Sequence, residues 1–210
     1  MGRMFDPEGK FMHYGGKLWD MIWLNILVIV FSLPLVTMGA ATSAMHYVLL
    51  KIYRDEEGKI TRSFFLAFRD NLKNSTLLVL LFSLVLYLLS LSAGLAASGG
   101  IGWAAVLILA VMAAALCSLN WTLVFQARYR NSLMGTVRLG VLACLSHPLR
   151  SLAMEILALL PAALLAVALE NGILVLMAGF TLPGFVQVML YQKVLRNLET
   201  VPETAGETDD

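Results

Sequence analysis

Two long uncharged apolar stretches constrain the fold of this chain most strongly. Residues 76–97 and 101–125 contain no Asp, Glu, Lys or Arg. Each is at least as long as the roughly 20 apolar residues that an α-helix needs to cross the hydrocarbon core of a bilayer. Only Ser98-Gly99-Gly100 separates the two stretches. They therefore predict a helical hairpin that spans a membrane twice.

Further apolar stretches predict more spans. Residues 151–169 and 172–191 form a second candidate hairpin. Residues 19–50 are too long for one straight span, and Pro34 lies inside them. Because proline lacks a backbone donor and clashes with the preceding helical turn, we expect a kink there. The expected fold is an all-α, polytopic transmembrane helical bundle of about five spans, a single domain over residues 1–199.

Composition and motifs exclude several function classes. Of the residues, 59% are hydrophobic and 14% are charged, whereas about 25% are charged in soluble domains. The apolar surplus must face a lipid bilayer, and a net charge of +1 gives no sign of nucleic-acid binding. Cys117 and Cys144 lack the spacing of a metal or redox site. No catalytic motif is present, so we expect no enzyme activity, cofactor or metal.

Basic residues predict the topology in the cell membrane. Lys and Arg concentrate in the long connections, residues 51–74 and 126–150, and are missing from the short turns. The positive-inside rule places these connections and the C-terminus in the cytoplasm. Five spans put the N-terminus outside, whereas a re-entrant segment at residues 22–50 would put it inside, and both alternatives stay open. Residues 200–210 are acidic and polar and are expected to form a disordered cytoplasmic tail.

Each basic connection also contains an amphipathic pattern. Apolar residues in 61–74 share one helical face, and apolar residues recur every four positions in 136–149. Both patterns precede a predicted hairpin, so we expect two interfacial amphipathic helices on the cytoplasmic side. The first supplies a candidate cytoplasmic interaction surface, formed by Phe64, Phe68, Arg69, Asn71 and Lys73.

Polar and helix-breaking residues in the first span form a candidate intramembrane site. Polar residues inside a membrane are candidates for function, and this span contains Asn25, Pro34, Thr37, Gly39 and Thr42. In one interpretation they serve packing: Asn25 bonds a neighbouring helix, Thr37 closes the kink and Gly39 allows close helix contact. In the other, a broken helix exposes its backbone to a cavity, as in transporters.

A specific set of residues in the first 90 positions carries a family resemblance. The set comprises Asn25, Ser32-Leu33-Pro34, Thr37, Gly39, Thr42, Ala44, Lys51, the Asp55-Glu56-Glu57-Gly58 loop, Phe64, Phe68, Asn71, Lys73 and Thr76. With these residues the front half resembles the YesL family of bacterial membrane proteins, whose function is uncharacterised. Members are commonly encoded beside carbohydrate ABC importers and sensor kinases in Gram-positive bacteria.

The resemblance implies a role near sugar uptake. We therefore expect a non-enzymatic accessory or interaction subunit that contacts a carbohydrate ABC permease or a sensor kinase. The alternative is a small-solute transporter or channel, which the Pro34 break and the intramembrane polar residues favour. Sequence alone identifies neither the substrate, the partner nor the oligomeric state.

Overall fold

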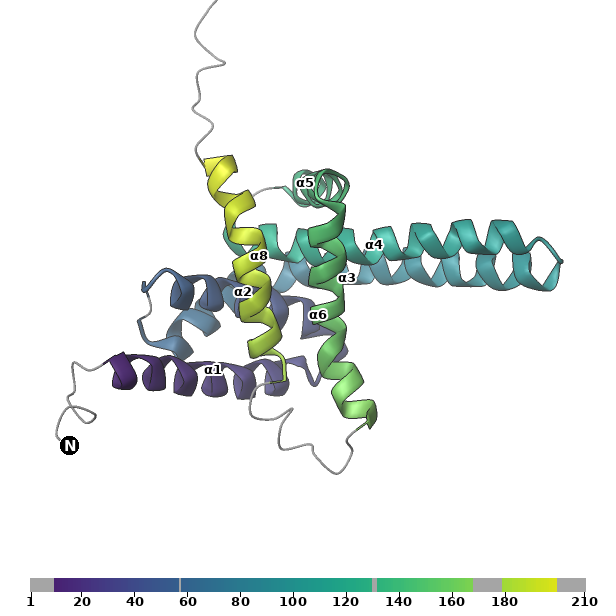
Figure 1. Ribbon diagram of the computed structural model, residues 1–210. Helices are drawn as coiled ribbons and strands as arrows, with labels where there is room; N and C mark the ends of the chain where they lie inside the picture. The colour runs from purple at the N-terminus through teal and green to yellow at the C-terminus, as the bar shows by residue number, and fades with distance from the viewer. Residues whose placement is uncertain (1–9, 57, 130–131, 168–178, 200–210) are drawn as a thin grey trace, which may run out of the picture.

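The structure is a computed structural model that describes residues 10–56, 58–129, 132–167 and 179–199. These residues form α-helices joined by short connections and contain no strand, so the predicted all-α class is confirmed (Figure 1). The predicted tail, residues 200–210, lies outside the described residues. The elements in chain order are α1 (Lys10–Ser32), the 3-10 turn η1 (Leu35–Thr37), α2 (Met38–Tyr53), α3 (Ile60–Ser98), α4 (Gly102–Arg128), α5 (Leu133–Ser146), α6 (Pro148–Val167) and α8 (Thr181–Glu199).

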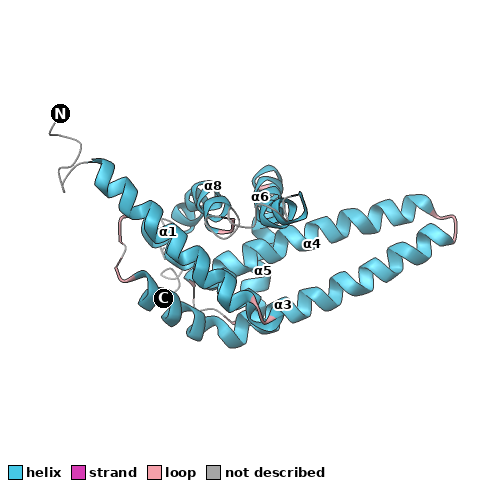
Figure 2. Ribbon diagram, turned by 90° about the horizontal axis from the view of Figure 1, so that it is seen from below, coloured by secondary structure: helices cyan, strands magenta, loops and turns pink. Residues whose placement is uncertain are grey.

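Helices α3 and α4 form a long antiparallel hairpin that extends beyond the other helices (Figures 1 and 2). We call residues 83–98 of α3 and 102–116 of α4 the outer half of this hairpin; none of these residues is buried. The turn at its tip contains Gly100, whose φ of 75° lies in the left-handed region that glycine adopts without strain. Helices α6 and α8 stand upright in Figure 1 and are seen end-on in Figure 2, so they cross the hairpin steeply.

Helix α2 lies at the centre of the packing. It contacts α1, α3, α4 and α8, and Ala40, Ala41, Ala44, Val48 and Leu49 have no exposed surface. Small side chains allow helix axes to approach closely, which increases van der Waals contact where lipid offers no hydrophobic driving force. The short side chains of α2 therefore let several helices meet around it.

Glycines mark the closest of these helix contacts. A Cβ on Gly39 of α2 would lie 2.7 Å from the carbonyl oxygen of Ser75 on α3. A Cβ on Gly140 of α5 would lie 2.9 Å from the carbonyl oxygen of Ser118 on α4. Because the nearest atoms include backbone, a larger residue at either position would force the two helices apart.

Three helices of the described residues are long and apolar enough to cross a membrane: Gly15–Ser32, Ile60–Ser98 and Gly102–Arg128. The bent pair Leu133–Ser146 and Pro148–Ala163, which turns by 109°, makes a fourth if the two helices count as one span. These lengths and compositions fit a helical membrane bundle. The number of five spans stays a prediction, because part of the predicted span at 172–191 lies outside the described residues.

The predicted boundary between an amphipathic helix at 61–74 and a span at 76–97 is absent. Both segments belong to the continuous helix α3. No glycine or proline occurs between residues 60 and 93, so nothing interrupts the i to i−4 hydrogen bonds of the backbone. The second amphipathic segment does end before a separate helix, α6, because Pro148 disfavours a helical conformation at His147.

We expect opposite responses to alanine at two helical glycines. Gly39→Ala should lower the free energy of unfolding by about 1–3 kcal/mol, the usual cost of overpacking. A Cβ on Gly94 meets nothing within 4 Å, so Gly94→Ala should leave stability unchanged or raise it by up to about 1 kcal/mol. Thermal unfolding in detergent measures both, and a loss of equal size in the two variants would contradict the packing described.

Candidate functional site

The helix break at Pro34 is closed by threonine side chains. Helix α1 ends at Ser32 and α2 begins at Met38. The Thr37 hydroxyl lies 2.7 Å from the carbonyl oxygen of Phe31 and 2.8 Å from that of Pro34, and it can donate to either. The Thr76 hydroxyl of α3 donates to the carbonyl oxygen of Val36 at 2.9 Å. The hydroxyls thus donate hydrogen bonds to carbonyl oxygens that lack a regular helical N–H partner at the break.

Asn25 caps a helix from the far end of the chain. Its side chain is fully buried, and its Oδ1 accepts hydrogen bonds from the backbone N–H groups of Phe180 (2.9 Å) and Thr181 (3.2 Å). These groups lie at the start of α8, where the first N–H groups have no partner within the helix. Asn25 therefore holds the N-terminus of α8 against α1.

One of the five predicted intramembrane site residues, Thr42, lines the cavity beside α2. Gly39 lies in the contact between α2 and α3. The hydroxyl of Thr42 donates to the carbonyl oxygen of Met38 at 2.9 Å, and its side chain borders a cavity beside α2. Asn25, Pro34, Thr37 and Gly39 are absent from that lining. In the structure Asn25 caps α8, Pro34 and Thr37 form the break between α1 and α2, and Gly39 allows α2 to pack closely on α3.

The cavity has a volume of about 240 Å³ and lies among α1, α2, α4, α6 and α8. Most of its lining is apolar, as is usual for small-molecule sites, which combine hydrophobic walls with a few polar groups. Sequence reasoning did not group these polar residues because five separate helices supply them. They are Ser32, Thr42, His46, Asn120, Glu155 and Gln187.

Hydrogen bonds connect the polar groups around the cavity. Asn120 Nδ2 of α4 lies 3.5 Å from both Glu155 Oε2 and the carbonyl oxygen of Met154 on α6. Gln187 Nε2 of α8 donates to the same carbonyl oxygen at 2.8 Å. His46 Nδ1 lies 3.5 Å from the hydroxyl of Tyr191. These contacts fix the position of the polar side chains relative to the apolar walls.

Glu155 is the one lining residue with a formal charge at pH 7 when histidine is neutral. Within the described residues no Lys, Arg or His forms an ion pair with it. Nor do the described residues contain a group of three His, Cys, Asp or Glu side chains that could hold a metal ion. The cavity therefore offers one carboxylate, several hydrogen-bonding groups and apolar walls.

The candidate cytoplasmic interaction surface does not exist as one exposed patch. Phe64 is fully buried, and Phe68 is partly buried with its ring centroid 5.1 Å from that of Phe31. Asn71 is buried, and its Oδ1 accepts a hydrogen bond from Gln126 Nε2 of α4 at 3.2 Å. Arg69 and Lys73 are exposed. The helical spacing that aligns the phenylalanines turns them, together with Asn71, toward α1 and α4.

Residues 21–93 match a family model described as "Protein of unknown function, DUF624". The match extends from the second half of α1 through η1 and α2 into the outer half of the hairpin. Over this part the chain is similar to that family. No curated protein and no solved structure matches the chain.

Replacing the Asn25 cap should destabilise the fold. Asn25→Leu keeps the approximate shape of the side chain but leaves one buried and one partly buried N–H group without this acceptor, so we expect a loss of about 1–3 kcal/mol. Asn25→Asp retains an acceptor that complements a helix N-terminus and should lose less. Thermal unfolding in detergent ranks the two variants, and wild-type stability in Asn25→Leu would exclude the capping role.

Proposed function

We propose that this protein is a non-enzymatic membrane subunit that acts through contact with another membrane protein. The YesL resemblance points to a carbohydrate ABC permease or a sensor kinase as the partner. Under this proposal the basic connections and the C-terminus face the cytoplasm, as their Lys and Arg content implies. The observation that carries the proposal is the outer half of the α3–α4 hairpin.

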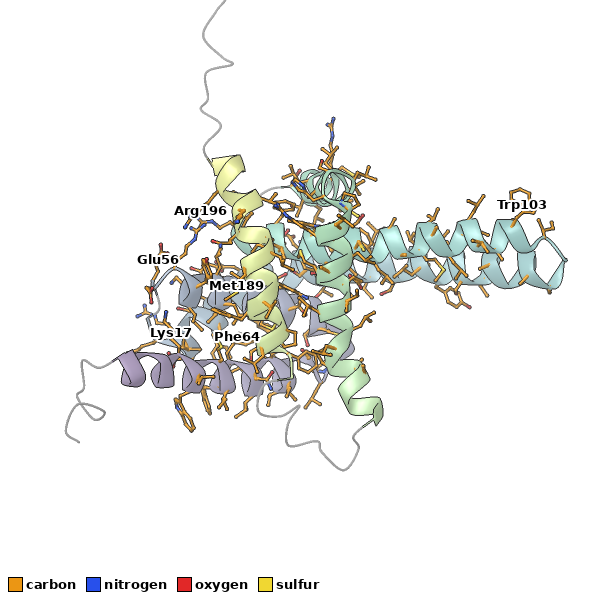
Figure 3. The ribbon with its side chains drawn as sticks, viewed as in Figure 1. Lys17, Glu56, Phe64, Trp103, Met189 and Arg196 are labelled. Atoms are coloured by element: carbon orange, nitrogen blue, oxygen red, sulfur yellow. The ribbon has the colours of Figure 1, made fainter. Side chains whose placement is uncertain are left out.

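Most of the outer half extends beyond the other described helices (Figure 1), and α5 contacts it near its base, where Cys144 Sγ lies 3.8 Å from the carbonyl oxygen of Ala114. Large apolar residues such as Leu88, Leu95 and Val106 are exposed along it, and Trp103 lies near its tip (Figure 3). The hydroxyls of Ser90 and Ser92 donate to carbonyl oxygens of their own helix at 2.7 and 2.9 Å. These two serines thus bring no unsatisfied hydroxyl donor into an apolar environment.

Small residues on the outer half suit it for packing against other membrane helices. Gly94, Ala97, Ala110 and Ala113 are exposed, and small residues let membrane helices approach each other closely. A hairpin that reaches beyond its own bundle can therefore enter a helix bundle of a second protein while α2 keeps the rest of the chain together.

A small-solute transporter or channel is the second candidate function. The cavity among α1, α2, α4, α6 and α8 favours it, because it places polar groups within an apolar helical bundle. This candidate requires a solute to bind in the cavity and then to pass through it.

Site-specific photo-crosslinking tests the contact proposal. A photoreactive phenylalanine derivative is placed at Leu88 or Val106 of the outer half, and at Met134 or Leu152 as controls that are exposed elsewhere. In cells grown on a glycan that induces a carbohydrate importer, the outer-half positions should give adducts with a permease or sensor kinase. The control positions should give none. Adducts of equal yield at all four positions, or no protein adduct at Leu88 and Val106, would contradict the proposal.

A further inference from the structure

We propose that the cavity among α1, α2, α4, α6 and α8 binds a small, singly charged organic cation that carries an apolar group. This inference goes beyond the contact function. It shares with the transporter or channel candidate only the requirement for a solute-binding site. Binding of the cation without transport would still support it. The argument depends on the charge, the hydrogen-bonding groups and the size of the cavity.

Charge selects a cation. Glu155 is the single carboxylate at the cavity, and within the described part of the chain no basic side chain pairs with it. A carboxylate in apolar surroundings is costly unless it is paired and hydrogen-bonded. Among the described residues, its one hydrogen bond to a side chain comes from Asn120 Nδ2 and is long at 3.5 Å. A ligand cation beside Glu155 would supply the missing charge partner.

The neighbouring amides favour a ligand that donates hydrogen bonds. Asn120 and Gln187 both use their side-chain nitrogens to donate to oxygens of α6. Each amide therefore retains its oxygen as an acceptor beside the cavity. Acceptors near a carboxylate stabilise an ammonium group and give little to an anion.

The walls and the volume favour an organic ligand of limited size. Leu116, Leu119 and Leu123 of α4 and Leu157 of α6 line the cavity, and such apolar walls bind an apolar group. The volume of about 240 Å³ is below the roughly 300–1,000 Å³ of pockets that hold drug-sized molecules. A divalent metal ion is a poor fit, because Ca²⁺ takes about 6–8 oxygen ligands and one carboxylate is present.

Calorimetric titration of the purified full-length chain in an uncharged detergent tests the inference. Benzylammonium is the cationic probe, because its charge can pair with Glu155 and its N–H groups can donate hydrogen bonds to the amide oxygens. Benzyl alcohol and phenylacetate, which also carry a phenyl group, are the neutral and anionic comparison probes. We expect saturable binding of the cation and an affinity for either comparison probe that is weaker by about tenfold or more, as for loss of a charge-assisted contact.

Three variants locate the site. Glu155→Gln removes the charge with little change in shape and should weaken cation binding by about tenfold or more. Ala158→Phe places a ring in the cavity lining and should also weaken it. Glu56→Gln removes an exposed carboxylate at the turn between α2 and α3, away from the cavity (Figure 3), and should leave affinity unchanged.

Two results would overturn the inference. One is equal affinity for the cationic, neutral and anionic probes, which would indicate partition into apolar surface. The other is wild-type affinity for the cation in folded Ala158→Phe, or in folded Glu155→Gln. Because the titration uses the isolated chain, its outcome is independent of the crosslinking result that decides the contact function.

Discussion

The packing of α2 is the constraint on which the rest of the structure depends. This helix is shorter than the spans around it, yet it contacts α1, α3, α4 and α8. Alanine and glycine on its surface set how closely those helices approach. Polar links add to the packing: the Ser43 hydroxyl lies 3.1 Å from that of Ser75 on α3 and 3.3 Å from the carbonyl oxygen of Leu123 on α4. The outer half of the hairpin can extend freely because its inner half is fixed against α2.

The break at Pro34 allows α2 to occupy this position. It separates α2 from α1, so the chain need not cross the bundle in one straight line. The carbonyls released at the break are satisfied locally by Thr37 and from α3 by Thr76. Earlier in α1, Asn25 accepts hydrogen bonds from the start of α8. Helix α8 then packs on α2 through Gly184. Polar residues in an apolar segment thus determine how distant parts of the chain assemble.

Local patterns predicted the local features of this fold, and long-range packing decided the others. The uncharged stretches predicted α3 and α4 because apolar length is a property of consecutive residues. The amphipathic face at Phe64 and Phe68 was recognised, but the pattern alone does not show whether such a face meets a bilayer surface or a neighbouring helix. The cavity could not be predicted, because His46, Asn120, Glu155 and Gln187 lie far apart in the sequence.

Hydrogen exchange followed by mass spectrometry tests the central role of α2 most directly. The measurement compares backbone amides along the chain in detergent, where slow exchange reports helices that open rarely. If α2 is the packing centre, peptides from residues 41–52 should exchange more slowly than peptides from α5 and from the outer half of the hairpin. Exchange in α2 as fast as in α5 would contradict this account, because a helix enclosed by four others should not open as readily as one at the periphery.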